Sequence, residues 1–224
     1  ELFANAVMNG GGLKDHSNDE LAAIMAGKKV GVGFSMTDRF FLLSGNTNRE
    51  DLETQLQLQT AYLMHPGYRQ DGVTLLRRAI PMIYNKMDHE VQGAMKKQVP
   101  AILYRNNPRF TFPTQEQLTS YQVKDVRDWV DAPLKNNYME VTVTGDFRTE
   151  DIIPLLERTV GAVPKRAEAP ATLDETLRHP AMADFNFSKD LTYDSSIDKT
   201  MVCLFWKTPG GENKKLARRL NMLK

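Results

Sequence analysis

Apolar residues recur at helical spacing in the first eight positions and predict a helix with one buried side. That side consists of Leu2, Phe3, Ala6 and Val7. The pattern stops at the glycines of residues 10–12, which favour a helix end. Ser17 and Glu20 then have the spacing of a capping box, so a short second helix is expected to begin there and to end at Gly27.

Two β-rich runs follow, Val30 to Phe34 and Arg39 to Leu43, and the residues between them, Ser35 to Asp38, suit a hairpin turn. The next pattern is helical, with Asn48 as a cap and Pro66 as a stop. One stripe of this helix consists of Leu52, Leu56, Gln59 and Leu63.

Residues 70–105 are again helical in pattern, but Pro81 and Pro100 each remove a backbone donor. Several shorter helices are therefore expected there instead of one rod. Between Thr114 and Trp129 a further helix is expected, with Ser120 as its cap. The stripe behind that cap consists of Val123, Val126 and Val130.

The last third of the chain predicts a strand, a helix and a linker. Tyr138 to Thr144 alternates like a strand, and Gly145 turns it into a helix from about Glu150 to Val160. Residues 165–180 are rich in alanine, proline and charge, as linkers are. The remaining predictions are strand-like runs at Phe185 to Phe187 and Thr200 to Trp206, and a helix at Asn213 to Leu223.

Composition and charge exclude some classes of partner. The 224 residues are 41% hydrophobic, which suits a globular chain with one sizeable core or two unequal ones. The 29 basic and 28 acidic side chains leave no net field to attract nucleic acid or an anionic membrane. No apolar run approaches the ~18 residues of a membrane span. Neither a nucleic-acid partner nor a membrane span is expected.

The chain begins and ends inside helical patterns and opens without a signal peptide, which favours a segment of a longer polypeptide. Its single cysteine, Cys203, lies in an apolar run without a neighbouring histidine or cation. We therefore expect a buried, unreactive thiol, and no intrachain disulfide is possible.

No familiar catalytic constellation is present in the residues themselves. The histidines are His16, His65, His89 and His179. Neither H-E-x-x-H nor H-x-x-E-H occurs, and the near miss at His89-Glu90 has glycine at position 93. A serine elbow G-x-S-x-G and the third glycine of a dinucleotide fingerprint are also missing. The residues alone indicate a globular domain without a visible active site.

Four segments in order nevertheless have a family resemblance. They are Leu13 to Leu21 after the glycine-rich break, Ala26 to Val30, the helix from Asp51 to His65, and Val141 to Phe147 followed by Pro154 to Glu157. In this order and spacing they resemble the repeated domain of pitrilysin/insulinase-type zinc metallopeptidases, and most closely the third of four homologous domains. The same domain builds mitochondrial processing peptidase and the core proteins of a respiratory complex.

The resemblance implies an α+β fold, a two-layer sandwich of a mostly antiparallel sheet covered on one face by helices. Residues 1–164 would form a degenerate peptidase-like domain lacking its upstream strands. Residues 165–182 would be a linker, and residues 183–224 would begin the next homologous domain.

The resemblance also implies where a zinc site would have been. In catalytic copies, the helix before the glycine-rich break carries H-x-x-E-H, and matching Ser17 to the serine after that motif places its residues at Phe3, Ala6 and Val7. These side chains cannot bind Zn²⁺ or activate water. A third ligand would come from a later helix, where residues 72–87 contain no acidic side chain. No catalytic, cofactor-binding or metal-binding residue is expected in this segment, and zinc is expected in the catalytic domain of the parent protein.

The implied function is that of a non-catalytic structural and substrate-chamber domain in a zinc metalloendopeptidase that degrades or processes peptides. Its partners would be other domains of the same polypeptide and the enclosed peptides, and the family resemblance implies the periplasm. The alternative is a scaffold subunit like the respiratory core proteins, with no peptidase activity. An autonomous small-molecule enzyme is a weaker alternative, which a pocket with convergent polar groups would favour.

Overall fold

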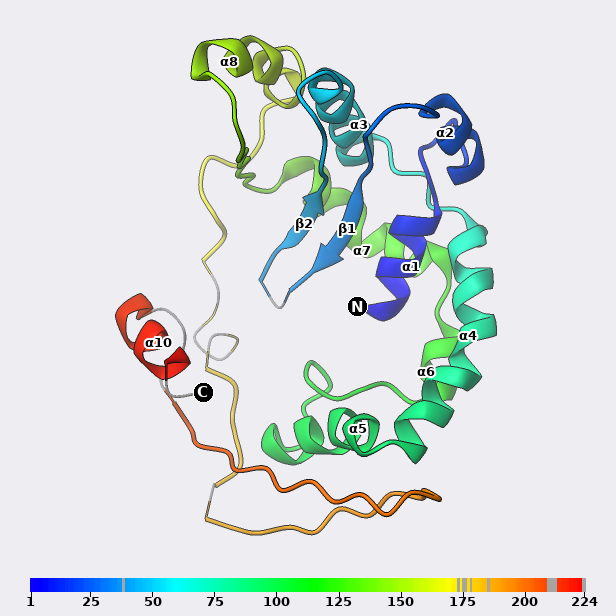
Figure 1. Ribbon diagram of the computed structural model, residues 1–224, viewed down its shortest axis with the longest axis vertical. Helices are drawn as coiled ribbons and strands as arrows, with labels where there is room; N and C mark the ends of the chain where they lie inside the picture. The colour runs from blue at the N-terminus through cyan, green and yellow to red at the C-terminus, as the bar shows by residue number, and fades with distance from the viewer. Residues whose placement is uncertain are drawn as a thin grey trace. The chain divides into compact units, whose positions relative to one another are not determined.

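The structure is a computed structural model, and it describes residues 1–37, 39–172, 174, 177, 179–184, 186–208 and 213–222. Asp38, Phe185 and Leu223, which belong to a predicted turn, strand and helix, lie outside the described residues, as does part of the predicted linker. By packing, the chain divides into two units (Figure 1). Unit 1 consists of Glu1–Ile80 with Glu116–Ala171, and unit 2 of Pro81–Gln115 with Thr172–Lys224.

Unit 1 begins with two short helices, α1 (Leu2–Gly10) and α2 (Asn18–Ile24). The predicted capping box is confirmed, because the Ser17 hydroxyl accepts from the amide of Glu20 while the amide of Ser17 donates to the Glu20 carboxylate at 2.7 Å. After α2 the chain turns through Gly27, whose φ of 83° favours glycine.

The predicted hairpin is confirmed, with its strands displaced along the sequence. β1 (Gly33–Met36) pairs with β2 (Phe41–Ser44) in an antiparallel register. The turn lies two residues later than expected, and the Thr37 amide donates to the Phe40 carbonyl across it at 3.0 Å. Ser35 therefore lies in a strand and not in the turn.

Side-chain amides from two helices bond to the backbone of β1 and of the residues just before it. The Asn9 carboxamide of α1 donates to the Phe34 carbonyl and accepts from the Phe34 amide, at 2.8 and 2.7 Å. Gln55 makes the same pair of bonds to Gly31, both at 2.9 Å. The backbone groups of these two residues are thus satisfied without a third strand.

Two longer helices complete the core around the hairpin. α3 (Leu52–Met64) follows Asn48, whose side chain accepts from the amide of Asp51 at 2.8 Å. α7 (Val123–Asn136) buries the predicted valine stripe together with Leu134. The predicted Ser120 cap is wrong, because Ser120 is the last residue of α6 (Gln115–Ser120) and its hydroxyl bonds back to the Gln117 carbonyl. The capping box of α7 is instead formed by Gln122 and Asp125.

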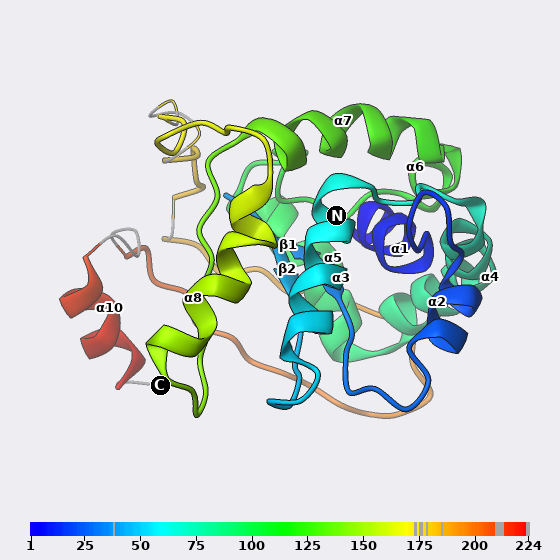
Figure 2. The same cartoon turned by 90° about the horizontal axis from the view of Figure 1, so that it is seen from above.

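The layers of unit 1 follow from these contacts. α1 packs against β1 and α7, while α3 packs against β2, α7 and α8 (Thr149–Glu157). Figure 2 shows α8 beside α3, with the short helix η1 (Val160–Ala162) following it. An α+β fold is confirmed, with a small two-stranded antiparallel sheet in the described residues. A larger sheet remains a prediction.

Residues 138–144 were predicted to form a strand, and this is wrong in the structure. The segment has no strand assignment, and Val141 is 47% exposed. A strand is defined by a neighbour that takes its backbone hydrogen bonds, and none of the described residues supplies one here. The helix expected after it is confirmed as α8, which ends earlier than predicted.

The two prolines expected to break the following region lie inside helices. α4 (Gln70–His89) contains Pro81, and α5 (Val91–Leu103) contains Pro100. The break falls at Glu90, which has extended backbone. Here α5 folds back so tightly that a Cβ on Gly93 would lie 2.4 Å from the Met87 Cα, so close packing and not proline determines the corner.

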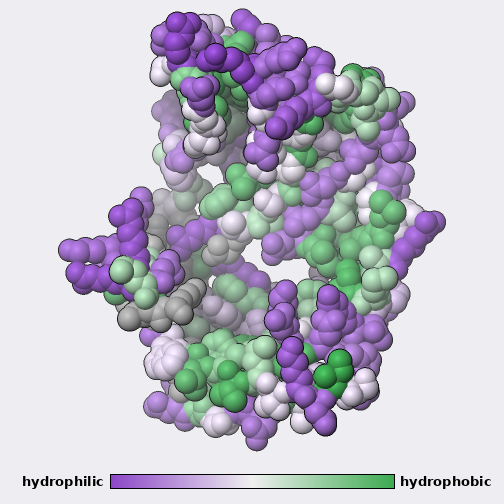
Figure 3. Space-filling model, in the orientation of Figure 1, coloured by the Kyte–Doolittle hydropathy of each residue, from purple (hydrophilic) through white to green (hydrophobic). Residues whose placement is uncertain are grey.

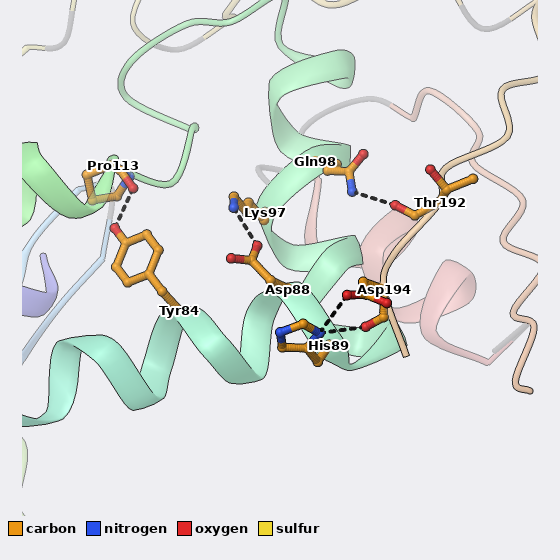
Figure 4. Close-up of polar contacts among 8 residues, drawn as sticks. All are labelled: Tyr84, Asp88, His89, Lys97, Gln98, Pro113, Thr192 and Asp194. Atoms are coloured by element: carbon orange, nitrogen blue, oxygen red, sulfur yellow. Dashed lines mark hydrogen bonds and ion pairs between the residues drawn. The ribbon is translucent and has the colours of Figure 1, made fainter. Parts of the chain in front are cut away.

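Unit 2 joins α5 to an extended segment, residues 186–208, through polar contacts (Figure 4). His89 Nδ1 lies 2.7 Å from the Asp194 carbonyl, and the Gln98 carboxamide donates to the Thr192 carbonyl at 3.4 Å. Lys97 pairs with Asp88 at 2.5 Å. The two hydrogen bonds hold the extended segment to the end of α4 and to α5, and the ion pair joins α5 to α4.

Two predictions for this extended segment are wrong. Residues 200–206 have no strand assignment, for the same lack of a neighbouring strand. Cys203, expected to be buried, is exposed because the run around it is not covered. α10 (Lys214–Asn221) begins where predicted, after Asn213, whose side chain accepts from the amide of Leu216. In the part of the chain that the structure describes, no helix has the length and apolar character to cross a membrane.

Candidate functional site

α1 is the element on which a zinc motif would lie if the family resemblance holds. Phe3 and Val7, at the two histidine positions, are 3% and 0% exposed, and Ala6 is partly buried. The Phe3 ring lies 5.7 Å from that of Tyr121 between centroids. Because the buried side chains of α1 are apolar, this helix contributes to the core.

α1 and α4 approach so closely that no side chain fits between them. A Cβ on Gly72 would lie 2.0 Å from the Ala6 carbonyl oxygen, and one on Gly10 would lie 2.4 Å from the Gly72 Cα. Real Cβ atoms do not make such contacts. The contact between the two helices is therefore made by backbone at Gly10, Gly72 and the Ala6 carbonyl.

The buried side of α4 is apolar as well. Every third or fourth residue is buried, in the stripe Val73, Leu76, Ile80, Tyr84 and Met87. No acidic residue lies between Gly72 and Met87. This helix has no carboxylate to offer a metal ion along that stretch.

The loop after α1 is fixed by a residue that the sequence did not single out. The Arg69 guanidinium donates to the carbonyls of Gly11, Leu13 and Lys14, at 3.3, 2.5 and 2.9 Å. Its neighbour Tyr68 has a φ of 46°, and its hydroxyl contacts Asp131 at 3.4 Å. Burial, and then Asp131, raise the pKa of the Tyr68 hydroxyl far above its ordinary value. Tyr68 therefore stays neutral and serves as a hydrogen-bond donor.

Metal-binding side chains do not gather in the described residues. Across these residues there is no group of three or more His, Cys, Asp or Glu that could hold an ion. His16 and His65 are exposed, and His89 contacts the Asp194 carbonyl (Figure 4). His89, which begins the incomplete H-E-x-x-H motif, is thus held by a contact within the fold.

Two surface grooves of unit 1 are shallow, and each has one histidine in its lining, His65 in the first and His16 in the second. One of about 440 Å³ lies between α3 and the α8–η1 turn. Of its polar residues, Arg158 pairs with Glu53 at 2.9 Å and the Thr159 hydroxyl donates to the Leu155 carbonyl. A second groove of about 270 Å³ lies between α2 and α3 and includes His16. Neither arrangement has the convergent polar groups of a small-molecule active site.

Comparison with known proteins agrees with the sequence resemblance. Residues 120–224 match the family model described as the peptidase M16 inactive domain. The chain is 21% identical over 145 residues to the chloroplastic stromal processing peptidase of Pisum sativum, covering 64% of this chain and 12% of that protein. The counterpart in Arabidopsis thaliana matches to the same extent. The chain thus spans about an eighth of the curated relatives it matches.

Solved structures show the same fold at low sequence identity. A protease from Helicobacter pylori aligns with a TM-score of 0.58 at 13% identity, over 81% of this chain and 44% of that one. The ferredoxin protease FusC, crystallised with Arabidopsis ferredoxin, aligns with a TM-score of 0.57 at 16% identity, over 77% and 19%. The first half of the periplasmic protease PqqL from Escherichia coli aligns at 0.53 and 14%, over 76% and 38%.

Proposed function

Because this chain is a relative of the pitrilysin/insulinase-type peptidases and its residues 120–224 match their inactive domain, we propose that it is a non-catalytic wall of a substrate chamber. It would enclose peptides within a larger zinc metallopeptidase and leave the chemistry to another domain. A fold by itself does not fix a function, so the proposal depends on the candidate site.

The observation that carries the proposal is the contact of α1 with α4. Phe3, Ala6 and Val7, which the resemblance matches to the family's ligands and base, are apolar, and the backbone at Gly72 packs directly against the Ala6 carbonyl. A catalytic zinc site needs three protein ligands and an open position for water. This helix pair supports packing and does not support metal chemistry.

The wider setting is proposed from the relatives. A stromal processing peptidase and a ferredoxin protease both act on polypeptides by name, and each is much longer than this chain. We propose that the partners here are other domains of the same polypeptide and the peptides they enclose, with zinc in a catalytic domain of the parent. No nucleic-acid partner is proposed. The periplasmic location of PqqL supports a periplasmic location for the parent.

The proposed division of the chain also explains its exposed apolar run. Residues 1–164 would be the degenerate domain, 165–182 the linker and 183–224 the beginning of the next one. Val202, Leu204 and Trp206 alternate along an extended backbone and are 83%, 71% and 73% exposed. Figure 3 shows apolar side chains gathered near α5 and this segment. Pairing of residues 138–144 and 200–206 with further strands would complete a two-layer sandwich.

The test compares the parent protein with a form that lacks residues 1–164, measuring zinc content and cleavage of an unstructured peptide. The proposal predicts that the shortened parent keeps its zinc and loses most of its cleavage, because enclosure and not the metal has been removed. Retained zinc also shows that the catalytic domain still folds.

Two outcomes would contradict the proposal. Stoichiometric tight binding of Zn²⁺ to the present chain in calorimetry would place chemistry in this segment. A parent without zinc or peptide cleavage would instead support a scaffold subunit.

A further inference from the structure

The C-terminal end of α7 has an unusual set of hydrogen-bond donors. The last carbonyls of a helix have no partner within the helix and must find donors elsewhere. In α7 the helix itself supplies only the Asn137 amide, which donates to the Pro133 carbonyl at 3.1 Å. The carbonyls of residues 134–137 all point to a segment some thirty positions later in the sequence.

Arg166 and Ala167 supply every one of these donors. The Arg166 guanidinium donates to the carbonyls of Leu134, Lys135 and Asn137, the last two at 2.8 and 2.9 Å. The amide of Ala167 donates to the remaining carbonyl, that of Asn136, at 2.9 Å. Four consecutive carbonyls at a helix end are thus satisfied by two adjacent residues.

The charge of Arg166 suits this position. Unpaired carbonyls give a helix C-terminus a partial negative charge, which a cation stabilises. The one nearby cation on the last turn, Lys135, is paired with Asp131 at 2.8 Å. Partial burial lowers the pKa of Arg166, yet the group remains charged at neutral pH.

We infer that Arg166 is a clamp that fastens the start of the proposed linker, residues 165–182, to the end of α7. The linker can therefore reorient only beyond Ala167. The sequence places the beginning of the linker at Lys165, two residues before the end of this clamp at Ala167. The neighbouring ion pair of Lys165 with Glu168 has side chains 84% and 81% exposed and adds little restraint. The end of α7, and not the end of η1, therefore fixes the position from which the chain continues after Ala167.

This inference does not depend on the proposed function, since it concerns how one connector is held. The test is amide hydrogen exchange of the full 224-residue chain, resolved by residue with NMR. In the wild type, the exchange rate of the Ala167 amide should be at least about 10-fold lower than the rates of the Glu168 and Ala169 amides. The hydrogen bonds of Arg166 and Ala167 to the end of α7 would protect it.

Three variants distinguish a local loss of the clamp from a loss of overall stability. Arg166→Gln should raise the exchange rate of Ala167 to that of Glu168 while the first turns of α7 keep their protection. Arg166→Lys keeps the charge but cannot reach three carbonyls, so it should give an intermediate rate. Lys165→Gln is the matched control and should leave the Ala167 rate unchanged.

Equal exchange of Ala167 and Glu168 in the wild type would overturn the inference, whatever the variants do. So would an unchanged Ala167 rate in both Arg166 variants. If Arg166→Gln unfolds the chain, seen as lost protection in α1 as well, the wild-type comparison and Arg166→Lys decide the matter.

Discussion

At the scale of single residues, two glycines and an alanine decide what α1 can do. Gly10 and Gly72 bring two helix backbones into direct contact beside Ala6. Helices approach this closely only where side chains are absent, and the space is then lost to any ligand. The sequence showed that ligand side chains are missing from α1, but it did not show that the backbone of α4 packs directly against this helix.

Gly72→Ala should destabilise the chain by about 1–3 kcal/mol, because its new Cβ meets the Ala6 carbonyl and the packed helices must separate. Urea unfolding followed by circular dichroism measures the change. Gly31→Ala is the control, since a Cβ there meets nothing within 4 Å, and it should change the free energy of unfolding by less than about 0.5 kcal/mol. Equal effects of the two substitutions would mean that the helix contact is loose.

At the scale of elements, the beginnings and ends of helices were the most predictable features. The capping box at Ser17, the helix end near Gly10 and the stripe of α7 depend on residues within one or two turns. Corners and strands were less predictable. The break at Glu90 depends on how Gly93 packs on Met87, and a strand exists only when a distant segment pairs with it.

Ser17→Ala should cost about 1 kcal/mol of stability near pH 7, because the hydroxyl caps α2. The amide of Ser17, and then its hydroxyl, lower the pKa of the Glu20 carboxyl below its ordinary value of 4.5. A lowered pKa contributes stability above the ordinary value, and this contribution is lost as the pH falls through the folded value. The cost of Ser17→Ala should therefore shrink between pH 7 and pH 2.

Thermal or urea unfolding of both proteins at several pH values measures this dependence. Ser120→Ala is the matched control, because that hydroxyl only bonds back to a carbonyl of its own helix. Its small effect should not vary with pH. A cost of Ser17→Ala that stays constant down to pH 2 would show that the Ser17 hydroxyl does not contribute to the lowered pKa of the Glu20 carboxyl.

At the scale of the whole molecule, the exposed stripe of Val202, Leu204 and Trp206 has no cover among the described residues. Large apolar side chains in such a row favour association with another surface. The expectation that Cys203 is buried assumed that this apolar run lies in a core, and the local pattern does not reveal whether a covering element is present.

Replacing these three residues with Thr, Ser and Ser should leave the stability of this chain within about 0.5 kcal/mol, because little apolar contact is lost. The same change should weaken binding to the other domains of the parent by about 1.5–3 kcal/mol per fully covered side chain. Co-purification of this chain with the rest of the parent, expressed separately, measures the binding. Met82→Ser removes another exposed apolar side chain, 74% exposed, and should have no effect on it. Undiminished binding of the triple variant would exclude the stripe as the contact.

The sequence by itself determined the helix boundaries set by local caps, the presence of a hairpin, and the absence of ligand side chains from α1, because each depends on residues close together in the chain. Tertiary structure decided the rest. Asn9 on Phe34, Arg69 on the loop after α1, and Arg166 on α7 each join positions 25 or more apart, and no periodicity records such pairings. A polar side chain that serves a distant backbone carbonyl has the same pattern in the sequence as one that faces water, so only the folded chain distinguishes them.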